Sequence, residues 1–120
     1  MNLLEIFENS DGLLKFPAGT TIFKEGSEGD FMYVVVKGRI RLSLQNEYIG
    51  EESAGGIVGE MALLDSDKRS ATATSLTDCL LAPIDQHSFK LLIKHTPDFA
   101  LHVMKVLAAR LRLANEMIVH

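Results

Sequence analysis

A glycine, an acid and an arginine stand close together in the middle of the chain, in a pattern that could bind an anion. A short β segment, Ile57–Val58, ends at Gly59, and a single helical turn is expected to begin at Glu60. The start of a helical turn leaves backbone N–H groups without partners, and a glycine there lets a ligand approach the backbone. Arg69 follows, and a guanidinium beside free amides can bind a phosphate bidentately.

The acid suits a different part of the same ligand. A carboxylate at Glu60 would repel a phosphate at contact, whereas it readily accepts hydrogen bonds from a ribose hydroxyl. An acid for a sugar, a guanidinium for a phosphate and amides between them describe a nucleotide site. Two simpler interpretations remain. An arginine after a polar loop is ordinarily a solvated surface charge, and Glu60 also suits a first-turn acid that favours the helix dipole.

The elements that must position these residues are short strands followed by helices. Residues 39–45 alternate between apolar and polar, as a strand with one buried face requires. The apolar run 31–36 suits a strand covered on both sides. Further short strands are expected at Leu13–Phe16, Thr20–Phe23, Ala71–Leu76 and Cys79–Ile84. Many short strands with turn residues between them predict a sandwich or a barrel.

The last third of the chain has the pattern of two helices. Asp85 is a good N-cap for a helix to about His95, and Thr96-Pro97 begins a second helix that runs to about Val119. The second helix has an apolar stripe that predicts packing on the β region: Ala100, Val103, Met104, Leu107, Leu111, Ala114 and Ile118. Other apolar residues lie off the stripe and indicate a second partner, for which a two-fold homodimer is the commonest solution: Phe99, Val106, Leu113 and Met117.

The central motif resembles a known family. Gly59-Glu60-Met61-Ala62-Leu63, followed by Arg69-Ser70-Ala71-Thr72, is similar to the phosphate-binding cassette of the cyclic-nucleotide-binding domain family, which includes the catabolite activator protein, the protein kinase A regulatory subunit and cyclic-nucleotide-gated channels. The resemblance extends upstream through Phe23–Gly26, Gly29–Tyr33 and Lys37–Ile40, and downstream through Leu76-Thr77, Phe89 and Pro97. It therefore covers nearly the whole chain, from about Leu13 to Ile118.

The family resemblance implies a mainly β fold with C-terminal helices. The expected architecture is a jelly-roll (double-stranded β-helix) barrel over about residues 13–84, with flanking helices over about 86–119. Residues 1–120 would form a single cyclic-nucleotide-binding domain.

The same resemblance implies a role for each residue of the motif. Glu60 would bind the ribose 2′-hydroxyl and Arg69 the exocyclic phosphate oxygens of cAMP or cGMP. The backbones of three residues would supply amides, namely Gly59, Met61 and Ala62. The Ser70 hydroxyl would lie near the phosphate or the base. The pocket walls would include Ile57, Val58 and Leu42.

The chain departs from the family at the positions that read the base. In the catabolite activator, serine or threonine on the final helix contacts the adenine amino group, and the aligned positions here are Ala114 and Asn115. Asn115 is therefore the candidate for a base contact. Ser70 is not the threonine that accompanies cGMP preference in some members, which favours cAMP.

The implied function is a regulatory sensor that binds a cyclic nucleotide and signals through the C-terminal helix, and not an enzyme. Two alternatives remain: a degenerate, nucleotide-free interaction module, and the ligand-sensing part of a longer transcription regulator or channel. A metal-dependent enzyme on a similar barrel would need several histidine and carboxylate ligands on strands. The expected strands carry no histidine, so no metal site is expected.

Composition limits the partners and the compartment. The formal net charge of −4 and the pI near 5.5 speak against direct binding of nucleic acid. Cys79 is the only cysteine, so the chain cannot hold an internal disulfide and a reducing compartment is expected. The first residues do not read as a signal peptide, and no window reaches the length of a membrane span. These features predict a cytoplasmic protein.

Overall fold

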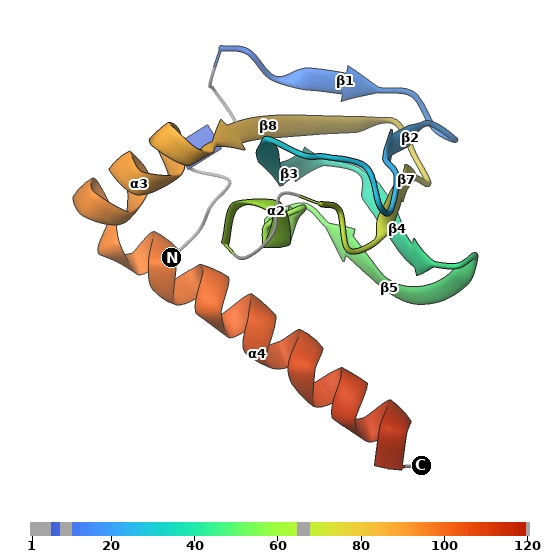
Figure 1. Cartoon of the computed structure of the whole chain (residues 1–120). Helices are drawn as coiled ribbons and strands as arrows, with labels where there is room; N and C mark the ends of the chain where they lie inside the picture. The colour runs from blue at the N-terminus through green and yellow to red at the C-terminus, as the bar shows by residue number, and fades with distance from the viewer. Residues whose placement is uncertain (1–5, 8–10, 65–67, 120) are drawn as a thin grey trace.

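The computed structural model describes residues 6–7, 11–64 and 68–119, and its strands precede its two long helices (Figure 1). The strands are β1 (Leu14–Phe16), β2 (Thr21–Phe23), β3 (Phe31–Lys37), β4 (Arg39–Leu44), β5 (Glu47–Ser53), β6 (Ile57–Val58), β7 (Thr72–Ser75) and β8 (Cys79–Asp85). The helices are the short α2 (Met61–Leu64), α3 (Gln86–His95) and α4 (Pro97–Val119).

The strands form two four-stranded antiparallel sheets, ordered β1-β8-β3-β6 and β2-β7-β4-β5. The predicted mainly β fold with C-terminal helices is confirmed; of the sandwich and the barrel that the strand pattern predicted, the two sheets form the sandwich and do not close into a barrel. Strands β1 and β2 have three residues each and β6 has two. All three lie at sheet edges, where such short segments offer too few backbone groups to close the two sheets on each other.

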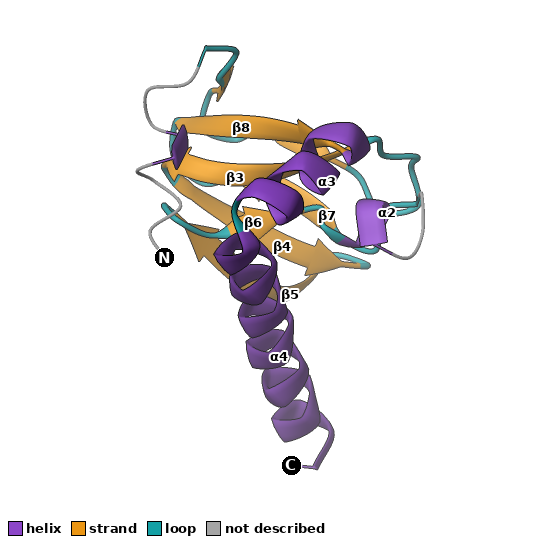
Figure 2. Cartoon of the chain, turned by 90° about the vertical axis from the view of Figure 1, so that its left-hand side faces the viewer, coloured by secondary structure: helices purple, strands orange, loops and turns teal. Residues whose placement is uncertain are grey.

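The sheet that contains β3 is buried on both faces. Met32 and Val34 of β3 belong to one core cluster, which also holds Phe89 of α3 and Phe99 of α4. Val35 belongs to the second cluster, which lies between the two sheets. The successive side chains of β3 thus enter two cores, as the apolar run in its sequence predicted. Figure 2 shows α3 and the start of α4 lying across the β3 and β8 face.

The two helices begin where the sequence predicts. The Asp85 side chain accepts a 2.8 Å hydrogen bond from the Ser88 amide, and this bond lowers the pKa of the Asp85 carboxyl. Helix α4 starts after Thr96 and continues as a long rod away from the sheets (Figure 1). Within the part of the chain that the structure describes, no helix is both long enough and apolar enough to cross a membrane.

The buried face of α4 differs from the predicted stripe. Phe99, expected off the stripe, is fully buried and lies edge-on against Phe89 of α3, with 5.7 Å between ring centroids. Met104 and Leu111, expected to pack inward, are 58% and 63% exposed. The contact between the two phenylalanines sets the rotation of α4, so Val103 faces the sheet and the outer part of the stripe faces away. The side chains of residues 114 and 117–119 lie outside the described set.

Candidate functional site

The central motif forms a sharp connection between β6 and α2. Strand β6 pairs with β3 and ends at Gly59, whose φ of 78° lies in the left-handed region that favours glycine. The helical turn follows at once: the Ala62 amide donates to the Gly59 carbonyl at 3.3 Å, and the Leu63 amide donates to the Glu60 carbonyl at 3.0 Å. A Cβ atom at position 59 would lie 2.5 Å from Arg69 Nη1. Glycine is thus required both for the turn and for the approach of Arg69.

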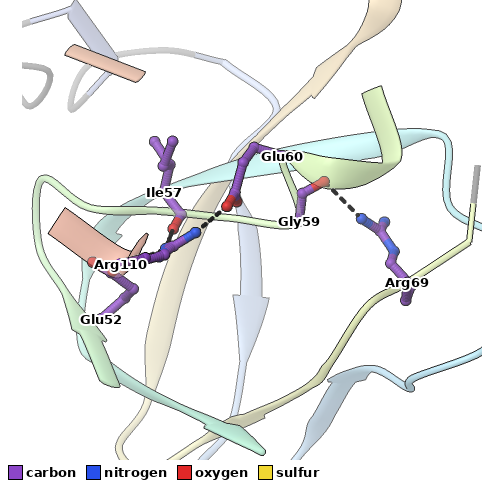
Figure 3. Close-up of polar contacts among 6 residues, drawn as sticks. All are labelled: Glu52, Ile57, Gly59, Glu60, Arg69 and Arg110. Atoms are coloured by element: carbon purple, nitrogen blue, oxygen red, sulfur yellow. Dashed lines mark hydrogen bonds and ion pairs between the residues drawn. The ribbon is translucent and has the colours of Figure 1, made fainter. Parts of the chain in front are cut away.

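Arg69 is fixed by its backbone in front of β7. Its amide donates to the Ser27 carbonyl at 2.8 Å, and its own carbonyl accepts from the Gly26 amide at 2.8 Å. These bonds tie it to the loop between β2 and β3, and the side chain that they position is only 6% exposed. Its Nη1 donates to the Gly59 carbonyl at 3.1 Å (Figure 3). The preceding polar loop, 65–67, lies outside the described residues.

The Arg69 guanidinium lies against an aromatic ring and forms no ion pair with a carboxylate of the described residues. Its Cζ atom is 4.3 Å from the centroid of the Phe23 ring, and among the described residues its buried Nε has no hydrogen-bond partner. Burial lowers the pKa of Arg69, while the fields of Tyr33, Asp30 and Glu60 act in the opposite direction. An arginine remains protonated under such conditions, so the site holds a positive charge that is incompletely bonded.

Glu60 is held from the other side by Arg110 of α4, as Figure 3 shows. The Glu60 residue is 3% exposed, and its Oε1 accepts from Arg110 Nη1. Arg110 Nη2 also donates to Glu52 Oε1 at 2.8 Å and to the Ile57 carbonyl at 2.6 Å. Desolvation lowers the pKa of Arg110, but the attraction of Glu60 and Glu52 outweighs it and raises the pKa above its usual value. Arg110 is therefore a cation paired with two carboxylates.

One pocket, open to the solvent, is lined by both arginines. The lining contains eight residues of the predicted set, which the fold brings together from β4, β6, α2 and the segment before β7: Leu42, Val58, Gly59, Glu60, Met61, Ala62, Arg69 and Ser70. Two predicted residues do not line it. Ile57 is buried beside Arg110, with its carbonyl bonded to the guanidinium, and Asn115 is exposed on α4.

Three lining residues were not predicted: Phe23, Ala71 and Arg110. Arg110 could have been found from the sequence, because it follows Val103 and Val106 at helical spacing and therefore falls on the inward face of α4. A charge on such a face needs a buried partner. Phe23 had no such signal, because an apolar residue in a strand ordinarily indicates core packing.

The pocket can bind a small ligand that has an anion at one end and a hydroxyl donor at the other. Arg69 offers guanidinium N–H groups to an anion, and Glu60 offers carboxylate oxygens to hydroxyls. The other walls include apolar side chains such as Leu42, Val58 and Met61. Among the described residues there is no group of three or more histidine, cysteine, aspartate and glutamate side chains that could hold a metal ion.

Comparison with known proteins matches residues 13–96 to the family model described as the cyclic nucleotide-binding domain. The chain is 34% identical to a cGMP-dependent protein kinase of Drosophila melanogaster over 80% of its own length. It is 29% identical to a CRP-like cAMP-activated global transcriptional regulator of Mycobacterium tuberculosis over 83% of its length. It spans 9% of that kinase and 47% of that regulator.

Solved structures match the same fold. The catabolite activator protein of Thermus thermophilus superposes with a TM-score of 0.75 at 30% sequence identity. The match covers 88% of this chain and 53% of that one. The site described above thus lies in a fold shared with that regulator.

Proposed function

Because this chain belongs to the cyclic nucleotide-binding domain family, we propose that the pocket between Glu60 and Arg69 binds a cyclic nucleotide and that the domain is a regulatory sensor, not a catalyst. The observation that carries the proposal is the state of Arg69. It is 6% exposed and lines the pocket, yet no carboxylate of the described residues lies within ion-pair distance of it. A buried guanidinium without a counter-ion is a site for an anionic ligand.

In this proposal the Arg69 guanidinium binds the exocyclic phosphate oxygens and Glu60 binds the ribose 2′-hydroxyl. The backbones of Gly59, Met61 and Ala62 face the sugar phosphate, and Ser70, which is exposed at the rim, lies near the phosphate or the base. Leu42 and Val58 form the apolar wall. Ile57 acts from behind that wall through its carbonyl, which holds Arg110.

The nucleotide preference that we propose is cAMP over cGMP, because Ser70 is not the threonine associated with cGMP preference in some family members. The names of the two relatives include both nucleotides. The proposed base contact of Asn115 requires a rearrangement on binding, since Asn115 is exposed and lies outside the pocket lining.

Arg110 gives the proposed sensor a route from the pocket to the C-terminal helix. Arg110 belongs to α4 and binds Glu60, the residue assigned to the ribose, while Glu52 and the Ile57 carbonyl hold the same guanidinium. A hydroxyl that donates to Glu60 competes with Arg110 for its oxygens. Nucleotide binding would then shift the position of α4 by weakening one of its three polar attachments.

The outer face of α4 supports a homodimer in the same proposal. Leu101, Met104, Ala108 and Leu111 are exposed and follow each other at spacings of three and four residues, the pattern of a helix-pairing seam. Leu111→Lys should give a monomer in analytical ultracentrifugation. The control Lys94→Gln, which changes the charge at an exposed position of α3, should leave the dimer intact. A wild-type chain that sediments as a monomer at high micromolar concentration, with and without nucleotide, would contradict the dimer.

The experiment that tests the function is a calorimetric titration of the purified chain with cAMP, cGMP and linear 5′-AMP, side by side. The expected result is saturable one-to-one binding of both cyclic nucleotides, tighter for cAMP, and much weaker binding of 5′-AMP. The absence of heat and of any thermal stabilisation with either cyclic nucleotide at millimolar concentration would overturn the proposal.

A further inference from the structure

The Arg69 guanidinium lies in a cradle of two aromatic rings and Gly29, and no carboxylate of the described residues forms an ion pair with it. Its Cζ is 4.3 Å from the centroid of the Phe23 ring and 5.9 Å from that of Tyr33, and the two rings stack with 15° between their planes. Gly29 is buried beside the same guanidinium. We propose that Phe23 and Gly29 are positioning residues, which hold the guanidinium over the pocket in the orientation that a phosphate requires. This inference rests on the function proposed above.

Stacking on Phe23 suits this role because it leaves the donors of the guanidinium free. An aromatic face attracts a cation through its quadrupole and accepts none of the in-plane N–H groups. In the described contacts, only Nη1 donates, to the Gly59 carbonyl at 3.1 Å. A carboxylate in the place of the ring would hold Arg69 equally well but would also satisfy its charge, and a phosphate would then have to displace it.

The orientation of the Phe23 ring is itself fixed. The ring stacks on Tyr33 with 6.3 Å between centroids, and Phe23 packs against the core cluster between the two sheets. Tyr33 belongs to β3 and pairs with Val58, directly before Gly59. Strand β6, which leads into Gly59, and the Phe23 ring are thus held by the same strand β3. This arrangement fixes the guanidinium relative to Gly59.

Gly29 contributes space. A Cβ atom at this position would lie 2.2 Å from Arg69 Nε and 2.3 Å from Cζ, distances at which atoms overlap. The backbone of Gly29 does not need the left-handed conformation, so alanine would be tolerated by the loop but not by the guanidinium. Glycine at position 29 is therefore explained by the approach of Arg69, not by the turn in which it lies.

The test measures cAMP affinity and the Arg69 Nε–H signal in full-length variants. Phe23→Leu keeps apolar bulk and removes the aromatic face, so it should weaken cAMP binding about tenfold, and Phe23→Tyr should retain wild-type affinity within about twofold. Phe16→Leu is the matched control, because Phe16 packs against the same core cluster and, in the described part of the chain, the cation–π contacts of Arg69 are with Phe23 and Tyr33 instead. It should leave the affinity unchanged.

Nuclear magnetic resonance supplies a signature that a merely structural role would not change. The Arg69 Nε–H proton, assigned by its loss in Arg69→Lys, should be shifted upfield by the Phe23 ring current. The shift should vanish in Phe23→Leu and persist in Phe16→Leu. Gly29→Ala should displace the same signal and weaken cAMP binding at least tenfold while the circular dichroism spectrum is retained, so it tests the cradle even if Phe23→Leu does not fold.

Four results would overturn the positioning role of Phe23. An unchanged cAMP affinity in Phe23→Leu, or an Arg69 Nε–H chemical shift that is the same in Phe23→Leu as in the wild type, would overturn the positioning role. The proposed nucleotide site would remain. A wild-type chain that binds no cyclic nucleotide would overturn both, because there would be no phosphate to position. Equal losses of affinity in Phe23→Leu and Phe16→Leu would show that general packing, not the aromatic face, supports the site.

Discussion

The pocket is lined by two arginines that are bonded in opposite ways: Arg69 is buried, whereas the Arg110 side chain is 29% exposed. Arg110 is surrounded by acceptors: the carboxylates of Glu60 and Glu52 and the Ile57 carbonyl. Arg69 has one carbonyl acceptor, an aromatic face, and an Nε without a partner in the described part of the chain. Burial lowers the pKa of Arg69, whereas for Arg110 the attraction of Glu60 and Glu52 outweighs the effect of burial and raises the pKa.

This difference supports the proposal that Arg110 stabilises the fold and that Arg69 binds the ligand. A cation between two carboxylates gains nothing from another anion, whereas a buried cation without a counter-ion gains a great deal. In the proposed function, Arg110 attaches α4 to the sheets and Arg69 binds the ligand. This division predicts that substitutions at the two positions have complementary effects on stability and affinity.

The largest expected effect is at Arg69. Arg69→Gln should weaken cAMP binding by at least about 100-fold, because charge-assisted hydrogen bonds to the phosphate are lost, while the free energy of unfolding changes by less than about 1 kcal/mol. Calorimetry and urea denaturation measure the two quantities. The cAMP affinity of Arg69→Lys, which keeps the charge but not the bidentate geometry, should fall between those of the wild type and Arg69→Gln. An affinity that Arg69→Gln leaves intact would contradict the assignment.

The next effect is at Arg110, where stability should change more than affinity. Arg110→Gln leaves Glu60 buried without its cation, which should lower the free energy of unfolding by about 2 kcal/mol. Circular dichroism in urea is the suitable measurement, since the chain has no tryptophan. The double variant Arg110→Gln/Glu60→Gln should recover part of this loss. A stability equal to wild type would mean that α4 is held by its apolar face alone.

The smallest effect is expected at Glu52. Glu52→Gln removes one of the two carboxylates, but Arg110 keeps Glu60 and the Ile57 carbonyl, and the Glu52 side chain is 21% exposed. The free energy of unfolding should fall by about 0.5 kcal/mol and cAMP affinity should stay within about twofold of wild type. A loss of affinity as large as that of Arg69→Gln would show that the two ends of the pocket are not separable.

Much of the fold was predictable because its signals are local. The alternation over residues 39–45 and the caps at Asp85 and Thr96 predicted a strand and two helices close to those observed. Strand β5 was not predicted, since its residues are mostly exposed and carry no apolar alternation. It follows a turn in which Gln45 and Asn46 both have positive φ, a two-residue hairpin connection.

The motif that carries Glu60 and Arg69 could be predicted from the sequence, but the residues that contact these two side chains could not. Glu60 and Arg69 belong to one short stretch of sequence, so their types and spacing could be read together. Phe23 and Arg110 reach the pocket, and Gly29 reaches the Arg69 guanidinium, from other parts of the chain that only tertiary packing brings together. The rotation of α4 was also mistaken, because both faces of that helix are apolar and the Phe89–Phe99 contact decides which one is buried.

The most direct test of the central claim is a crystal structure of the chain with cAMP. The account predicts the cyclic phosphate beside the Gly59–Ala62 turn, with its exocyclic oxygens bonded to the Arg69 guanidinium and the ribose 2′-hydroxyl on Glu60. A nucleotide bound elsewhere, with Arg69 still donating only to the Gly59 carbonyl, would contradict it.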